Sequence, residues 1–203
     1  MRAFRYRLYP TKAQEAALLD ILRLTRELYN AALQERRDAY RKVGKSISVY
    51  EQMRTLPEVK RDRPEFKGIH AHILQGVLTQ LDRAFQGFFR RVKQGVTPRG
   101  DASARPVGAG YPRFKGADRW DSFAFKQVWD NSRNTWFGPG KVLETGRIYL
   151  PNIGNVRMNQ HRPMEGKPKT LTLKKEGNDW YAVPAWGRAS SPARFTMSGG
   201  GNS

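Results

Sequence analysis

The sequence contains no cysteine and no long apolar run. Disulfides and thiolate zinc sites are therefore excluded, and the composition fits a reducing compartment. A membrane-spanning helix needs about 18 consecutive apolar residues, and the sequence contains no run of that length. The amino terminus alternates arginine with aromatic residues and lacks the apolar core of a signal peptide. We therefore expect a cytoplasmic protein, with nucleoid association as an option, and no membrane partner.

Acidic residues are scarce. Asp and Glu number 18 against 37 Lys and Arg, so the formal net charge is +19 and the pI about 10.6. Such an excess favours a polyanionic partner, although an evenly basic surface, as in ribosomal proteins, has the same balance. Two-metal cleavage of phosphodiesters needs converging carboxylates. After Leu150 only Glu165, Glu176 and Asp179 remain, and the last two lie in a predicted turn.

Other catalytic patterns are also missing. We find no phosphate loop, no nucleophile beside a base and no Gly-x-Ser-x-Gly. His70 and His72 are two residues apart, which does not match a helical pair of metal ligands, and His161 stands alone. We predict no catalytic residue, no metal site, no cofactor and no small-molecule substrate.

The amino-terminal residues predict a strand followed by a long helix. Residues 2–9 alternate between an apolar face and a face that carries Arg5, Arg7 and Tyr9. Thr11 and Gln14 have the spacing of a capping box, which predicts a helix from Lys12 to a stop at Gly44.

Two further helices and a loop are expected next. A second capping-box spacing predicts a short helix from Val49 to the Leu56–Pro57 boundary, followed by a charged connector over residues 58–67. Apolar residues at three-and-four spacing predict a long amphipathic helix over residues 69–94 that ends in Arg90, Arg91 and Lys93. Residues 95–118 are rich in Gly and Pro and predict a loop, with disorder before binding as an open alternative.

From residue 119 onward the apolar period changes to two. This predicts short strands around residues 123–125, 142–143, 148–150, 156–158, 171–173 and 180–182, with a hairpin turn at residues 176–179. We expect an α+β fold in which the amino-terminal strand joins the later strands in a small β-barrel, with a helical lobe inserted. The expected units are residues 1–10 (first strand), 11–94 (helical lobe, helix-turn-helix-like at its start), 95–118 (basic loop), 119–183 (remaining strands) and 184–203 (disordered tail).

Cations and aromatic rings alternate at the end of the loop. Tyr111, Arg113, Phe114, Lys115 and Arg119 combine groups that follow phosphates with rings that stack on bases. This composition favours a nucleic-acid surface. An alternative for any one ring, such as Phe114 or Trp120, is that it anchors the loop on the core.

Several of these pieces occur together in a known order. They are the strand from Phe4 to Thr11, then Gln14, Tyr29-Asn30, the helix with Gln75, Leu78, Leu81, Ala84, Phe85, Phe88, Phe89 and Lys93, and the segment Gly110 to Lys115. In this order they resemble the amino-terminal half of the TnpB (OrfB) transposase proteins of bacterial insertion sequences, relatives of compact type V CRISPR effectors. The resemblance covers residues 2–183.

The resemblance implies a wedge-like barrel and a recognition lobe that together hold a structured guide RNA and its target DNA. It implies that nucleic acid contacts Arg7, Tyr9, Tyr29, Asn30, Lys93, Arg113 and Lys115. Basic and aromatic residues identified from the pattern alone complete the set. The predicted nucleic-acid contacts are Arg5, Arg7, Tyr9, Tyr29, Asn30, Arg90, Arg91, Lys93, Tyr111, Arg113, Phe114, Lys115 and Arg119.

The sequence departs from the family in its last part. Past Asp179 it has no Asp or Glu, so the metal-binding Gly-x-Asp-x-Gly of the RuvC-like nuclease is missing, as are that half's zinc-binding cysteines. We therefore expect a truncated, nucleic-acid-binding fragment without activity alone; Mg²⁺ is expected only for the missing domain. The open alternatives are a non-catalytic regulator of a full-length relative, an inert transposon remnant, or a nuclease domain supplied by a neighbouring reading frame.

Overall fold

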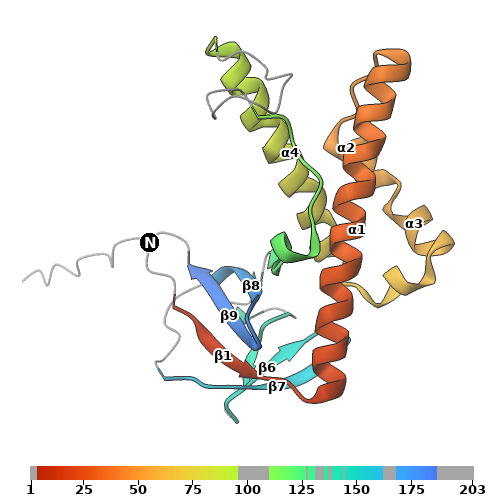
Figure 1. Ribbon diagram of the computed structural model, residues 1–203. Coiled ribbons are helices and arrows are strands. Elements are labelled where there is room, and N and C mark those ends of the chain that lie inside the picture. The colour runs from red at the N-terminus through yellow and green to blue at the C-terminus, as the bar shows by residue number, and fades with distance from the viewer. Residues whose placement is uncertain are drawn as a thin grey trace, which may run out of the picture.

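The computed structural model describes residues 4–95, 110–126, 128–130, 135–136, 139–143, 145–161 and 168–186. In this part of the chain a group of helices stands beside an antiparallel sheet, so the expected α+β class is confirmed. Figure 1 shows helices α1 (Lys12–Val43) and α4 (Ala71–Lys93) meeting near the sheet and diverging away from it.

Helix α1 follows strand β1 (Tyr6–Tyr9) almost directly. Its predicted capping box is present: the Gln14 amide N–H donates to the Thr11 hydroxyl at 3.3 Å, and the Thr11 N–H donates to the Gln14 side chain at 3.1 Å. The helix ends at Gly44, whose φ of 64° is left-handed, as glycine allows. Both predicted ends of this helix are confirmed.

The connector between the second helix and α4 contains more helix than the sequence predicted. Helix α2 (Val49–Arg54) begins at its predicted Ser48 cap, but a new helix α3 (Leu56–Asp62) and a 3₁₀ turn η1 (Pro64–Gly68) follow. Pro57 was predicted to stop a helix. It instead lies in the first turn of α3, where the missing N–H of proline has no cost.

In the part of the chain that the structure describes, the sheet has seven strands in the order β2-β8-β9-β1-β7-β6-β5. Their bounds are β2 (Ser122–Lys126), β5 (Val142–Leu143), β6 (Arg147–Leu150), β7 (Gly154–Met158), β8 (Pro168–Glu176) and β9 (Asp179–Trp186). The predicted strands are confirmed, and β1 joins the later strands at the centre of the sheet. A separate pair, β3 (Trp129–Asp130) with β4 (Thr135–Trp136), was not predicted.

The predicted closed barrel is wrong, because the sheet is open. Its edges are β2 and β5, which do not pair with each other in the described chain. Closure needs strands of matched length and stagger, whereas β5 has two residues and β2 packs against α4. β9 continues to Trp186, opposite Pro168, so the strand extends past the predicted boundary at 184. The rest of the predicted tail, like most of the loop at 95–118, lies outside the described residues.

One continuous core joins the helices to the sheet. α4 packs against both α1 and β2, and apolar side chains of all three are buried together. Buried Trp120, just before β2, donates its indole N–H to the Thr25 hydroxyl of α1 at 2.9 Å. The chain between α4 and β2 is therefore held firmly where it reaches the sheet.

Candidate nucleic-acid interface

Residues 110–116 lie between α1 and α4 and lead down to the sheet (Figure 1). The Asn30 side chain of α1 holds this segment at both backbone polar groups of one residue, Lys115. Its Oδ1 accepts from the Lys115 N–H at 2.8 Å, and its Nδ2 donates to the Lys115 carbonyl at 3.0 Å. In the structure both polar groups of the Asn30 side chain position Lys115, and its predicted contact with nucleic acid stays a prediction.

The other end of the segment is held by α4. Arg91 donates to the Gly110 carbonyl at 3.1 Å. The Tyr111 ring packs edge-on against Phe85 and Phe88, with centroids 5.4 and 5.3 Å apart. Partial burial raises the pKa of Tyr111. Tyr111 is therefore an anchor of the segment, although part of its ring stays accessible.

Tyr29 does not face solvent. It is 2% exposed, its ring lies 5.1 Å from that of Trp120, and burial raises its pKa. The Lys115 ammonium lies 5.8 Å from the Tyr29 ring. Tyr29 was predicted as a nucleic-acid contact, and the structure corrects this role to support beneath Lys115. Trp120 is buried and bonded to Thr25, so it anchors the loop on the core, as one of the two alternatives for these rings predicted.

Exposed cations surround this anchored segment. Arg113 is exposed on the segment itself, and Arg90 and Lys93 are exposed near the end of α4. Arg37 of α1 lies over the exposed Phe114 ring at 5.2 Å. Arg37 was not among the predicted contacts. An arginine on the polar side of a long helix is common in solvated helices, so its position in the sequence does not indicate binding.

Arg119 lies beyond the anchored segment, in the 3₁₀ turn η2 (Ala117–Arg119). It forms an exposed ion pair with Asp118 at 3.5 Å. Such pairs contribute little to stability, so the guanidinium remains accessible.

The predicted residues of β1 form a second surface. Arg5 pairs with Glu176 at 2.6 Å and Arg7 pairs with Asp179 at 2.5 Å, so two carboxylates of the β8–β9 turn neutralise them. Exposed Tyr9 lies next to Arg7 and to Arg157, at 5.3 and 5.6 Å. No contact among the described residues joins these β1 side chains to the segment 110–116.

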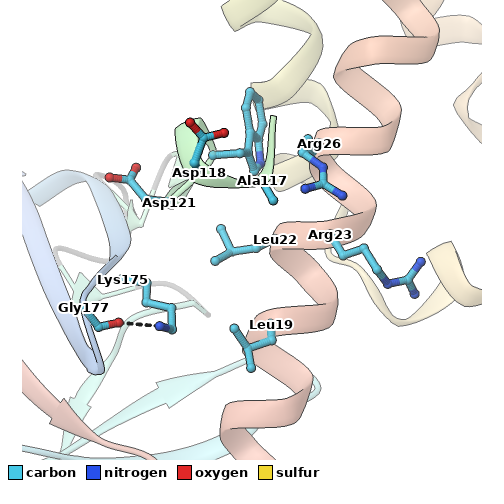
Figure 2. A pocket seen from close by; sticks show the side chains of 10 residues that line it. Leu19, Leu22, Arg23, Arg26, Ala117, Asp118, Asp121, Lys175 and Gly177 are labelled. Atoms are coloured by element: carbon cyan, nitrogen blue, oxygen red, sulfur yellow. Dashed lines mark hydrogen bonds between the residues drawn. The ribbon is translucent and has the colours of Figure 1, made fainter. Parts of the chain in front are cut away.

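A hollow of about 500 Å³ opens between α1 and the β8–β9 turn (Figure 2). Leu19 and Leu22 of α1 point toward it, opposite Lys175, which donates to the Gly177 carbonyl. Arg23 is engaged by Glu27 at 3.0 Å and by Asp20, and these carboxylates raise its pKa. The remaining lining residues are Arg26, Ala117, Asp118, Trp120 and Asp121. The mixed charges contain no arrangement of acid, base and nucleophile that indicates catalysis.

The described residues offer neither a cluster of metal ligands nor a membrane-spanning helix. Within the described ranges, no group of three or more His, Cys, Asp or Glu side chains is placed to hold a metal ion. His70 and His72 contact each other instead: the His72 N–H donates to His70 Nδ1 at 3.3 Å, which caps α4. None of the described helices is both long and apolar enough to cross a membrane.

Comparison with known proteins identifies relatives of this chain. A family model described as a helix-turn-helix domain, HTH_OrfB_IS605, matches residues 1–45. "Putative RNA-guided DNA endonuclease InsQ" of Escherichia coli (strain K12) is 26% identical over 201 residues, covering 98% of this chain and 44% of that protein. A "Putative RNA-guided DNA endonuclease" of Streptomyces pristinaespiralis is 25% identical over 186 residues, covering 89% of this chain and 40% of that protein.

Two facts qualify these matches. The chain spans less than half the length of the curated relatives that it matches. In addition, the region matched by the helix-turn-helix family folds here as a strand, β1, and one unbroken helix, α1. The family description therefore does not locate a DNA-reading helix pair in residues 1–45.

Proposed function

This chain is a relative of the TnpB/OrfB proteins of insertion sequences, and we propose that it binds nucleic acid through the anchored segment between α1 and α4. The observation that carries the proposal is the position of residues 110–116. Asn30 and Arg91 hold their backbone at both ends, so the exposed guanidinium of Arg113 has a defined place beside Phe114. Preorganised cations beside an accessible ring match phosphates and bases.

The finer proposal concerns the partner. The relatives are named as RNA-guided DNA endonucleases, and this supports a structured guide RNA and its DNA target as the partners of this chain. In our proposal the helices and the open sheet contact the same nucleic acid, because the segment leads directly from one to the other. The binding requires no cofactor. Cleavage is not part of the proposal.

Fluorescence anisotropy with the full chain tests it. A labelled RNA hairpin and a labelled DNA duplex are titrated between 50 and 200 mM salt. If about six to ten phosphates are neutralised, the affinity falls about 10³- to 10⁵-fold over this range. The arm that binds more tightly at equal salt identifies RNA or DNA as the main partner. Affinity that does not change with salt would contradict the proposal.

A matched pair of variants tests the place of binding. Arg113→Gln removes an exposed charge from the segment, whereas Arg61→Gln removes an exposed charge from α3. We expect Arg113→Gln to weaken binding and to reduce the slope of log affinity against log salt by about 1, with no such change for Arg61→Gln. Equal effects of both variants would mean that net charge alone, rather than this segment, drives binding.

A further inference from the structure

Three exposed side chains form a row across the solvent face of the sheet. Tyr9 of β1 is opposite Arg157 of β7, and Arg157 is opposite Arg147 of β6. Residues opposite one another share a face of the sheet, and neighbouring strands are about 4.8 Å apart. All three are exposed, whereas Leu8, Val156 and Ile148 beside them are buried. The row therefore lies on the side away from the core.

The two arginines of this row are not neutralised. Like charges directly opposite on a sheet are destabilising. Among the described residues neither Arg147 nor Arg157 has a carboxylate partner, whereas Arg5 and Arg7 on the same sheet have Glu176 and Asp179. Within the described part of the sheet, the acids thus gather at the β8–β9 end and leave the arginines of β6 and β7 without a carboxylate. An arrangement that costs stability in the free protein indicates an anionic ligand.

Aromatic rings flank these cations. Tyr149 is two residues along β6 from Arg147 and so points to the same face, and its amide N–H donates to the carbonyl of exposed Lys141 at 2.9 Å. Tyr149 is 40% exposed and Tyr9 is 42% exposed. The strip of Tyr9, Arg157, Arg147, Tyr149 and Lys141 therefore combines three cations with two aromatic rings.

We propose that this strip binds a single-stranded segment of nucleic acid. Arg147 and Arg157 contact consecutive phosphates, and a base stacks on Tyr149, whereas the Tyr9 ring supports the Arg157 guanidinium at 5.6 Å. Stacking requires unpaired bases, which a duplex does not offer, and a flat sheet that displays rings is a suitable platform for them. An acidic protein segment would need the charges but not the rings. The inference rests on the proposed function, but it concerns residues outside the segment between α1 and α4.

The test uses the full chain and three labelled probes: a 12-nucleotide oligouridylate, the matching oligothymidylate, and a 12-base-pair duplex. Tyr149→Leu removes a ring and is expected to weaken single-strand binding about 5- to 150-fold. Tyr149→Phe keeps the ring and is expected to bind as the unchanged protein does. Arg147→Gln is expected to weaken binding about fivefold at 0.1 M salt, because each phosphate contact on a single strand contributes a salt slope of about 0.7.

A second measurement separates a binding role from a structural one. Because Arg147→Gln relieves the repulsion with Arg157, we expect a higher urea midpoint together with the weaker binding. Arg61→Gln, the matched charge control on α3, is expected to leave single-strand binding unchanged. A lower midpoint for Arg147→Gln would mean that the arginine stabilises the fold, and it would overturn the inference.

The remaining outcomes are also decisive. Equal binding by Tyr149→Leu and Tyr149→Phe, or displacement of oligouridylate by a polyglutamate peptide of equal charge, would show a purely electrostatic surface and would overturn the single-strand assignment. If the unchanged chain binds the duplex but neither single strand, the inference fails while the proposed function stands. If it binds none of the probes and no hairpin, the proposed function fails as well.

Discussion

At the scale of single residues, the structure separates side chains that can contact a ligand from side chains that position them. Asn30 is the clearest example, since the family resemblance implied a nucleic-acid contact for it. Its side-chain amide instead pairs with both the backbone N–H and the backbone carbonyl of Lys115. No sequence pattern reveals this pairing, because the two residues are 85 positions apart.

The two hydrogen bonds between the Asn30 side chain and the Lys115 backbone, here called the Asn30 clamp, yield the first prediction. Asn30→Ala leaves the Lys115 N–H and carbonyl without these partners, so we expect a loss of about 1–3 kcal/mol in the free energy of unfolding. We also expect faster tryptic cleavage after Arg113 and Lys115. Asn155→Ala, an exposed change on β7, is the control. Unchanged cleavage in Asn30→Ala would show that the segment is held without the clamp.

His70 yields a prediction about pH. Its Nδ1 accepts the bond that caps α4, and burial, with the charges of His72 and Lys60, lowers its pKa below the ordinary value of about 6.5. The unfolded chain then takes up the proton first, so the stability is present above about pH 6.5 and falls as the pH drops through the folded pKa. Urea midpoints from pH 8 to 5.5 measure this loss.

His70→Asn is the matched variant, because asparagine is a good cap that does not titrate. We expect a flatter pH profile in this variant and an unchanged profile in His161→Asn. If the urea midpoint changed with pH equally in His70→Asn and in the unchanged protein, the pH dependence would belong to other groups.

At the scale of elements, periodicity and caps predicted where helices and strands lie, but packing decided the connections. The junction of α1, α2 and α4 is held by Arg36, which is 8% exposed. Its side chain donates to Gln52 at 2.8 Å and to Asp82 at 3.1 Å, and it lies over the Phe85 ring. No local pattern reveals this contact, because Arg36 and Asp82 are 46 positions apart.

The contact between Arg36 and Asp82 predicts a larger loss in the free energy of unfolding when one partner is removed than when both are removed. Asp82→Ala leaves a nearly buried arginine without its carboxylate, and we expect a loss of about 3 kcal/mol in the free energy of unfolding. Arg36→Met combined with Asp82→Leu removes both charges but leaves the buried Gln52 Oε1 without its donor, so we expect a smaller loss than for Asp82→Ala, of about 1–2 kcal/mol. Denaturation by urea measures both. A double variant as unstable as Asp82→Ala would contradict this account.

At the scale of the whole molecule, α1 and α4 share one core with the sheet, through β2 and the bond from Trp120 to Thr25. We therefore predict a single cooperative unfolding transition, in which the helical signal in circular dichroism and the tryptophan fluorescence change at the same urea concentration. Two separated transitions would mean that the helical lobe and the sheet unfold independently.

What the sequence by itself determined is local. The capping box at Thr11, the stop at Gly44, the apolar stripe of α4 and the alternation of β6 to β9 depend on neighbours within a few residues, and all were predictable. The tertiary structure alone decided that the sheet stays open, that Asn30 and Tyr29 support Lys115, and that Glu176 and Asp179 neutralise Arg5 and Arg7, whereas no carboxylate of the described residues pairs with Arg147 or Arg157. These outcomes depend on strand register and on contacts between distant residues, which no local pattern specifies.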